Sequence, residues 1–122
     1  MTLSRMWSIL DNNGFRIVTY TKNLIDYISE LVVNYPRSEV VLKDKLISAG
    51  YELLELVYLG NILEERLDVQ RRIIVKISML DAYLEFSYNR KCISLKKMQR
   101  GSRYLSVIRK MVYGWIKSVN QV

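Results

Sequence analysis

Apolar residues recur along most of the chain at spacings of three and four, which is the period of one helix face and not the alternation of a β-strand. The chain has one Pro and five Gly, so few residues interrupt a helix. This pattern predicts an all-α fold. Residues 1–15 are less regular and end in the turn-prone run Asp11-Asn12-Asn13-Gly14. We therefore expect an N-terminal lead-in over residues 1–15, followed by one helical domain over residues 16–122.

The first two helices of this domain meet at a proline. The first is expected from about Arg16 to Val33, because Pro36 disfavours helical geometry in the residue before it. The second begins at Pro36 or Ser38 and frays or kinks at Gly60-Asn61. Their inward positions are Val18, Leu24, Ile25, Ile28, Leu31, Val32, Leu42, Leu46, Ala49, Leu53, Leu56 and Val57.

The third and fourth helices each start at a capping residue. Asp68 is the expected N-cap of the third helix, which ends near Tyr88, and Ser94 caps the fourth, which continues to about Asn120. Three connections of a few residues imply antiparallel neighbours, and hence an up-down-up-down four-helix bundle. The remaining inward positions are Val69, Ile73, Ile77, Leu80, Leu84, Met98, Leu105, Ile108, Val112, Trp115 and Val119.

The side-chain inventory argues against an enzyme. The 122 residues include no His, so the commonest general base and the commonest zinc ligand are both missing. The single cysteine, Cys92, has no His to activate it and is expected to be an inert thiol. We expect no catalytic residue, no metal site and no cofactor.

Six carboxylates, which include pairs on the expected helices, could act as acid and base or ligate a metal. The ferritin-like di-metal signature requires a His beside its carboxylates, so we instead expect surface positions or contacts between subunits. These residues are Glu52, Glu55, Glu64, Glu65, Asp81 and Glu85.

The chain carries no signal for a membrane. The longest unbroken apolar stretch, residues 56–59, is far shorter than the roughly 20 residues that span a bilayer. The first residues do not form a convincing signal peptide. We therefore expect a cytoplasmic protein without a membrane partner.

The net charge of +7 is concentrated in the last third of the chain. Residues 1–85 contain ten basic and twelve acidic side chains, whereas residues 86–122 contain nine basic and none acidic. Such a segment is typical of a protein that binds a polyanion, and nucleic acid is the leading candidate.

A basic stripe follows the expected fourth helix. Lys96, Arg103, Lys110 and Lys117 recur every seven residues, with Arg100 between the first two, opposite the apolar face. At the rise of an α-helix the stripe extends about 30 Å, enough to follow several phosphates. A solvated face chosen for solubility is the alternative, although such a face would interleave acidic residues at i±3 or i±4.

The start of the same helix could bind a phosphate. Lys96 and Lys97 lie in its first turn, where lysines are mildly unfavourable beside the positive end of the helix dipole. Free N–H groups, Ser94 and Lys91 would complete such a site. The candidate nucleic-acid-binding residues are therefore Lys91, Lys96, Lys97, Arg100, Arg103, Lys110 and Lys117.

Nine tyrosines are many for this length. We expect most of them in the core or at its boundary with the hydroxyl reaching water, and platforms for stacked bases are the alternative. Further apolar residues lie outside the inward stripes and predict a surface for self-association. They include Val41, Leu54, Leu59, Ile74, Met79 and Phe86.

Three runs resemble those of the accessory variability determinant (Avd) family. They are Tyr35-Pro36-Arg37-Ser38-Glu39, Leu80-Asp81-Ala82-Tyr83-Leu84-Glu85, and Ile108-Arg109-Lys110-Met111-Val112-Tyr113-Gly114-Trp115-Ile116-Lys117. The resemblance covers about residues 16–119 and rests on packing motifs.

The resemblance implies a small four-helix bundle that accompanies the reverse transcriptase of a diversity-generating retroelement. It implies a non-enzymatic homo-oligomer, typically a ring of five subunits, that binds the reverse transcriptase and RNA or cDNA and supports mutagenic reverse transcription. Some members carry Arg at the positions of Asp81 and Glu85, so in this chain the cationic surface is expected on the fourth helix and the turn before it.

Two functions from different classes follow. The first is an oligomeric accessory factor that holds template RNA or cDNA by phosphate contacts without reading sequence. The second is a structural four-helix bundle that mediates assembly with an acidic partner protein.

Overall fold

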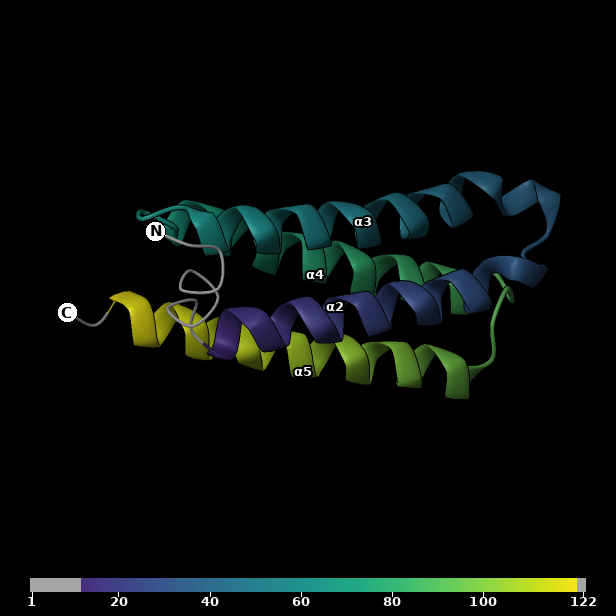
Figure 1. The fold of residues 1–122 in the computed structure, drawn as a ribbon. Coiled ribbons are helices and arrows are strands. Elements are labelled where there is room, and N and C mark those ends of the chain that lie inside the picture. The colour runs from purple at the N-terminus through teal and green to yellow at the C-terminus, as the bar shows by residue number, and fades with distance from the viewer. Residues whose placement is uncertain (1–11, 121–122) are drawn as a thin grey trace.

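Four α-helices account for nearly all of residues 12–120, the part of the chain that the computed structural model describes (Figure 1). Helix α2 spans Asn12–Leu31, α3 spans Val40–Ile62, α4 spans Leu67–Asn89 and α5 spans Leu95–Asn120. Two short 3-10 turns, η1 (Val32–Asn34) and η2 (Arg37–Glu39), connect α2 to α3 on either side of Pro36. No strand occurs between residues 12 and 120, so the all-α prediction is confirmed.

Each helix packs against two others. Helix α3 contacts α2 and α4, and α5 contacts α4 and α2, so the four helices enclose one interior. The connections α2–α3 and α4–α5 lie at one end of the structure, and the connection α3–α4 lies at the other (Figure 1). None of the described helices combines the length and the apolar character needed to cross a bilayer.

The predicted interior is largely confirmed. Of the inward positions whose side chains are described, all are buried except Ile25, Leu56 and Met98, which are partly buried. The side chain of Val119 lies outside the described part. The prediction missed Ile17 and Thr21, both fully buried in α2, where the Thr21 hydroxyl donates to the Ile17 carbonyl oxygen (2.7 Å). That bond allows a polar side chain to be buried in this interior.

Two boundary predictions are wrong. Helix α2 begins at Asn12, four residues before Arg16, so residues 12–14 form helix instead of a turn. Helix α3 ends at Ile62, directly after the Gly60-Asn61 pair at which fraying or a kink is expected, and both residues of the pair are buried. Residues 1–11 of the expected lead-in lie outside the described part.

The second wrong boundary concerns the start of α4. Arg66, not Asp68, occupies the N-cap position, and no side chain caps the helix. Asp68 lies in the first turn, where it pairs with Arg72 (Oδ2–Nε 3.2 Å). Asp68 therefore acts on the exposed surface of the helix and does not bind its free N–H groups.

Candidate nucleic-acid interface

The turn between α4 and α5 sets where the basic helix begins. The Cys92 N–H donates to the Ser87 carbonyl oxygen (2.8 Å) and the Lys91 N–H donates to the Tyr88 carbonyl oxygen (2.9 Å). This pair of bonds is the Schellman pattern that ends many helices, and it requires a left-handed residue at the position of Lys91. Lys91 has a φ of 62°, a conformation that glycine usually supplies.

Ser94 caps α5 as predicted. Its Oγ accepts the N–H of Lys97 at 3.2 Å. One of the N–H groups invoked for a phosphate site is thus already bonded within the protein. The side chains of Lys96 and Lys97 extend into solvent from this first turn.

The seven candidate residues share one property: each is exposed, and none forms an ion pair with a carboxylate of the described chain. The other two basic residues of the C-terminal third are paired. Arg90 Nη1 lies 2.9 Å from Glu39 Oε2, and Arg109 Nη2 lies 3.4 Å from Asp81 Oδ2. The basic residues of the C-terminal third are thus of two kinds. Two arginines form ion pairs with other parts of the bundle, and seven cations are open to solvent.

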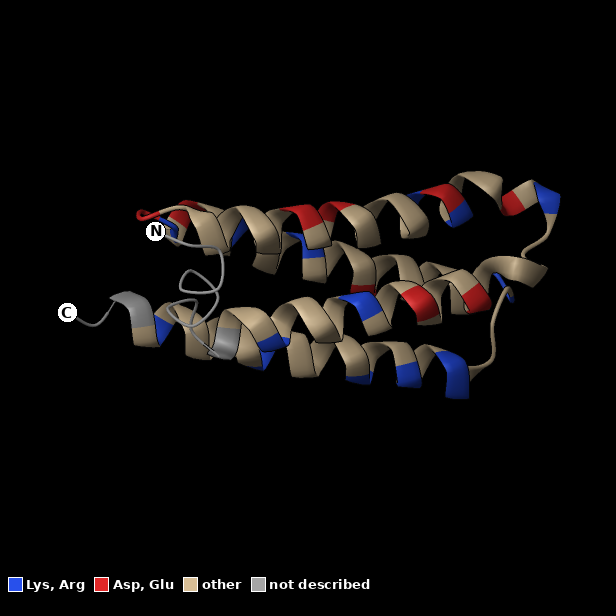
Figure 2. Cartoon of the chain, viewed as in Figure 1, with Lys and Arg blue, Asp and Glu red and all other residues tan. Residues whose placement is uncertain are grey.

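The face of α5 opposite these cations is the interior of the bundle. Leu105, Ile108, Val112 and Trp115 are fully buried, whereas Arg103 and Lys110 are exposed. Blue segments and no red ones follow α5 in Figure 2, whereas α3 carries red ones. The cationic side chains can therefore contact a partner without disturbing the core.

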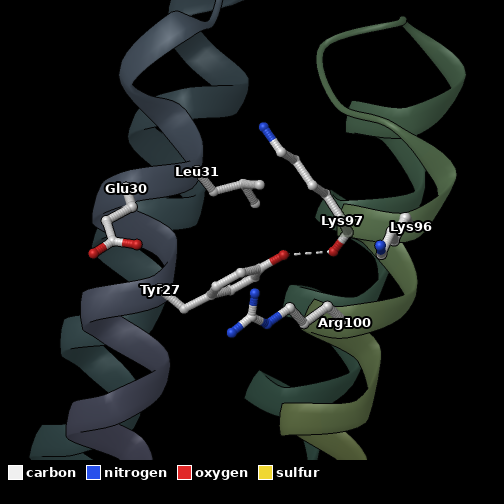
Figure 3. Close-up of a pocket in the computed structure, with 6 residues that line it drawn as sticks. All are labelled: Tyr27, Glu30, Leu31, Lys96, Lys97 and Arg100. Carbon is white, nitrogen blue, oxygen red and sulfur yellow. Dashed lines mark hydrogen bonds between the residues drawn. The ribbon is translucent and has the colours of Figure 1, made fainter.

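Two tyrosines lie beside the basic stripe, on the seam between α2 and α5. The rings of Tyr27 (α2) and Tyr104 (α5) have centroids 5.2 Å apart and planes tilted by 32°. The Arg100 guanidinium lies 5.6 Å from the centroid of the Tyr27 ring. The Tyr27 hydroxyl donates to the Lys97 carbonyl oxygen (2.6 Å), which ties α2 to the first turn of α5 (Figure 3).

Burial raises the pKa of the Tyr27 hydroxyl above its ordinary value, and the nearby Tyr104 adds to this effect. Arg100 and Arg103 oppose it. The hydroxyl consequently keeps its proton at neutral pH and remains a donor to Lys97. The sequence alone proposed base platforms only as an alternative, because no periodicity in it shows which tyrosines face the basic helix.

The seven candidate residues lie at different points along α5 and the turn before it. Lys96, Lys97 and Arg100 surround one pocket together with Tyr27, and Arg103 lines a second pocket that shares Arg100. Lys110 and Lys117 lie farther along α5 and line neither of these pockets. The candidates form one continuous surface along α5 and its preceding turn, not a single site.

The carboxylates singled out in the sequence do not converge. Glu52 pairs with Lys76 on α4 (2.6 Å), and Asp81 accepts hydrogen bonds from Ser102 (3.0 Å) and Arg109 (3.4 Å). Within residues 12–120, no group of three or more Cys, Asp or Glu side chains is placed to hold a metal ion.

Burial raises the pKa of the Cys92 thiol, the Glu39 carboxylate raises it further and Arg90 opposes the rise.

Neither the protein-family models nor the curated proteins searched contain a match to this chain.

Proposed function

We propose that this protein is a non-enzymatic, nucleic-acid-binding accessory protein of a diversity-generating retroelement. In this proposal it binds the reverse transcriptase together with template RNA or cDNA and supports mutagenic reverse transcription. The observation that carries the nucleic-acid part is the set of seven solvent-exposed cations without ion pairs in the described chain. The reverse transcriptase and the retroelement come from the resemblance of the three sequence runs to the Avd family.

An unpaired cationic surface favours a polyanion for a physical reason. Surface cations in a folded protein usually have acidic neighbours that relieve their repulsion. Helix α5 contains no acidic residue between Leu95 and Asn120, so the repulsion among its unpaired cations persists until a phosphate backbone neutralises them. Because phosphate contacts carry no sequence information, we expect binding that is strong at low salt and independent of sequence.

Exposed apolar side chains support the proposed self-association. Val41 is 68% exposed and Phe86 is 49% exposed, and Leu59 and Met79 also face solvent. Leu54 and Ile74, expected among the surplus apolar residues, are instead partly buried against the core. We propose an antiparallel up-down-up-down bundle that assembles into a ring, with five subunits suggested by the family resemblance. Light scattering at micromolar concentration tests this, and a monomer there would contradict it.

A salt titration tests the nucleic-acid function. For single strands, log K should fall with log salt by about 0.7 per phosphate contact. The double variant Arg103→Ala/Lys110→Ala should bind two unrelated RNAs more weakly than the wild type, and the loss of affinity should be about the same for both. The slope of log K against log salt should be shallower by about 1.4. Its fold should be unchanged, because both side chains are exposed.

Arg71→Ala/Arg72→Ala on α4 provides a matched control, since it also removes two exposed charges. Its slope should equal that of the wild type. A slope left unchanged by the α5 variant would exclude this face from the nucleic-acid surface and favour assembly with an acidic partner protein.

A further inference from the structure

Two neighbouring pockets open along the seam between α2 and α5. The first has a volume of about 310 Å³ and is lined by Tyr27, Glu30, Leu31, Lys96, Lys97 and Arg100. The second has a volume of about 300 Å³ and is lined by Tyr20, Arg100, Arg103, Tyr104 and Val107. Arg100 belongs to both, so the two pockets follow one another along the helix axis.

Each pocket combines flat groups with positive charge. In Figure 3 the ring of Tyr27 crosses the first pocket from α2, and the guanidinium of Arg100 lies against it from α5. Tyr20 and Tyr104 supply the aromatic rings of the second pocket, and Arg103 also lines it. Planar aromatic and guanidinium groups beside cations are the features on which proteins stack the bases of single strands.

Glu30 is the one acidic residue lining either pocket. Its carboxylate forms no ion pair with any residue of the described chain. It therefore leaves the positive charge of Lys96, Lys97 and Arg100 without a partner at the pocket.

The volumes limit what can enter. Both lie at the lower end of the range for small-molecule sites, roughly 300–1,000 Å³. A pocket of that size is large enough for a single base. In a duplex the bases are stacked inside the helix and cannot be splayed into side pockets, whereas the bases of a single strand can.

We propose that the α2–α5 seam binds single-stranded nucleic acid with one unstacked base in each pocket and Arg100 between the two bases. The inference rests on the proposed nucleic-acid function and adds base stacking to the phosphate contacts. It makes Tyr27, Tyr104 and the planar group of Arg100 part of the binding surface, and it limits the preferred ligand to unpaired strands.

The test compares two probes with the same number of phosphates: an oligodeoxyadenylate, and an abasic oligodeoxynucleotide of equal length. Binding is measured by fluorescence anisotropy at one salt concentration. Because the electrostatic contribution is equal, any preference for the base-bearing strand measures base contacts. We expect the wild type to bind oligodeoxyadenylate roughly tenfold more tightly or better, because two bases stack on the protein and the adenine–adenine stacking lost from the free strand offsets part of that gain.

Arg100→Lys keeps the positive charge and removes the planar group. We expect it to reduce the preference to about twofold or less, and to weaken binding of the oligodeoxyadenylate more than binding of the abasic strand. Arg109→Lys is the matched control on the same helix, because Arg109 pairs with Asp81 and lines neither pocket. It should keep the full preference.

Tyr104→Leu is a second variant that removes an aromatic ring but keeps an apolar side chain. Circular dichroism verifies that it folds, and it should also reduce the preference. Equal binding of both strands by the wild type would overturn the stacking inference and leave the proposed function intact, as would an unreduced preference in both pocket variants. Failure of the wild type to bind either strand would overturn the proposed function itself.

Discussion

Gly60 of α3 faces the indole of Trp115 of α5 so closely that a Cβ on Gly60 would lie 2.7 Å from Trp115 Cη2. The sequence suggested that this glycine marks a weak helix end, but its role is to make room for the largest fully buried side chain of the described core. Gly101 plays a similar role on α5, where a Cβ would lie 2.7 Å from Leu84 Cδ1. The two glycines thus set how closely α5 approaches α3 and α4.

Gly60→Ala should destabilise the protein by about 1–3 kcal/mol, because the added methyl group overpacks the ring of Trp115. Gly114→Ala is the control on the same helix as that indole. Gly114 is exposed and nothing lies within 4 Å of an added Cβ, so this change should raise the free energy of unfolding by about 1 kcal/mol through helix propensity. Urea denaturation measures the free energy of unfolding of both variants. If both variants were more stable, or both less stable, than the wild type, the close packing of Gly60 against Trp115 would be contradicted.

Trp115→Ala should cost about 3–5 kcal/mol, since the side chain is 0% exposed and its removal leaves a cavity. The exposed Tyr113 two residues earlier is the control, and Tyr113→Ala should change stability by about 0.5 kcal/mol or less. Denaturant midpoints at equal protein concentration distinguish the two. A cost below 1 kcal/mol for Trp115→Ala would place the indole outside the core.

Lys91→Gly should raise the free energy of unfolding by about 1 kcal/mol, because glycine adopts the observed φ of 62° without the steric cost that lysine incurs. Lys91→Ala removes the same charge but keeps the cost, so its stability should equal that of the wild type. If Lys91 contacts a phosphate, both variants should make the salt slope for RNA shallower by about 0.7. Equal thermal stability of the two variants would show that the turn is not strained at Lys91.

Cys92 should react with a thiol reagent more slowly than cysteine in an unfolded peptide at pH 8. Burial and the Glu39 carboxylate raise its pKa, so less of it is thiolate at that pH. Glu39→Gln removes a negative charge and releases Arg90 from its ion pair, and both changes favour the thiolate. The midpoint of the rate-against-pH curve should therefore move down in the variant, and a midpoint that stays or rises would be inconsistent with these contacts.

Helical periodicity predicts most of the residues that form the interior. Leu53, Leu80, Leu84, Ile108, Val112 and Trp115 were expected to lie together, and all are buried in one cluster. A spacing of three and four defines one face of each helix, and burying those faces leaves few alternative arrangements.

The ends of helices were harder to predict because local preferences competed with tertiary contacts. Asn12, Asn13 and Gly14 favour a turn as a short peptide, yet Gly14 is buried in α2 and its carbonyl oxygen accepts the Asn61 side-chain amide at 3.4 Å. That bond joins residues far apart in the sequence.

In the candidate site, too, the pattern within one helix could be predicted and the contacts between helices could not. The exposed cations of α5 follow from their seven-residue repeat. The contact of Tyr27 with Arg100 and Tyr104 depends on which face of α2 meets α5, and a single sequence does not specify this pairing.

The hydrogen bond from Tyr27 to the Lys97 carbonyl oxygen has a consequence for the thermodynamics of binding. It ties the Tyr27 side chain of α2 to the backbone of the first turn of α5, so the two walls of the seam are joined before any ligand is bound. If the seam binds a strand as proposed, the conformational entropy lost on binding falls mainly on the strand and on flexible side chains such as Lys96, because these two walls are already held together.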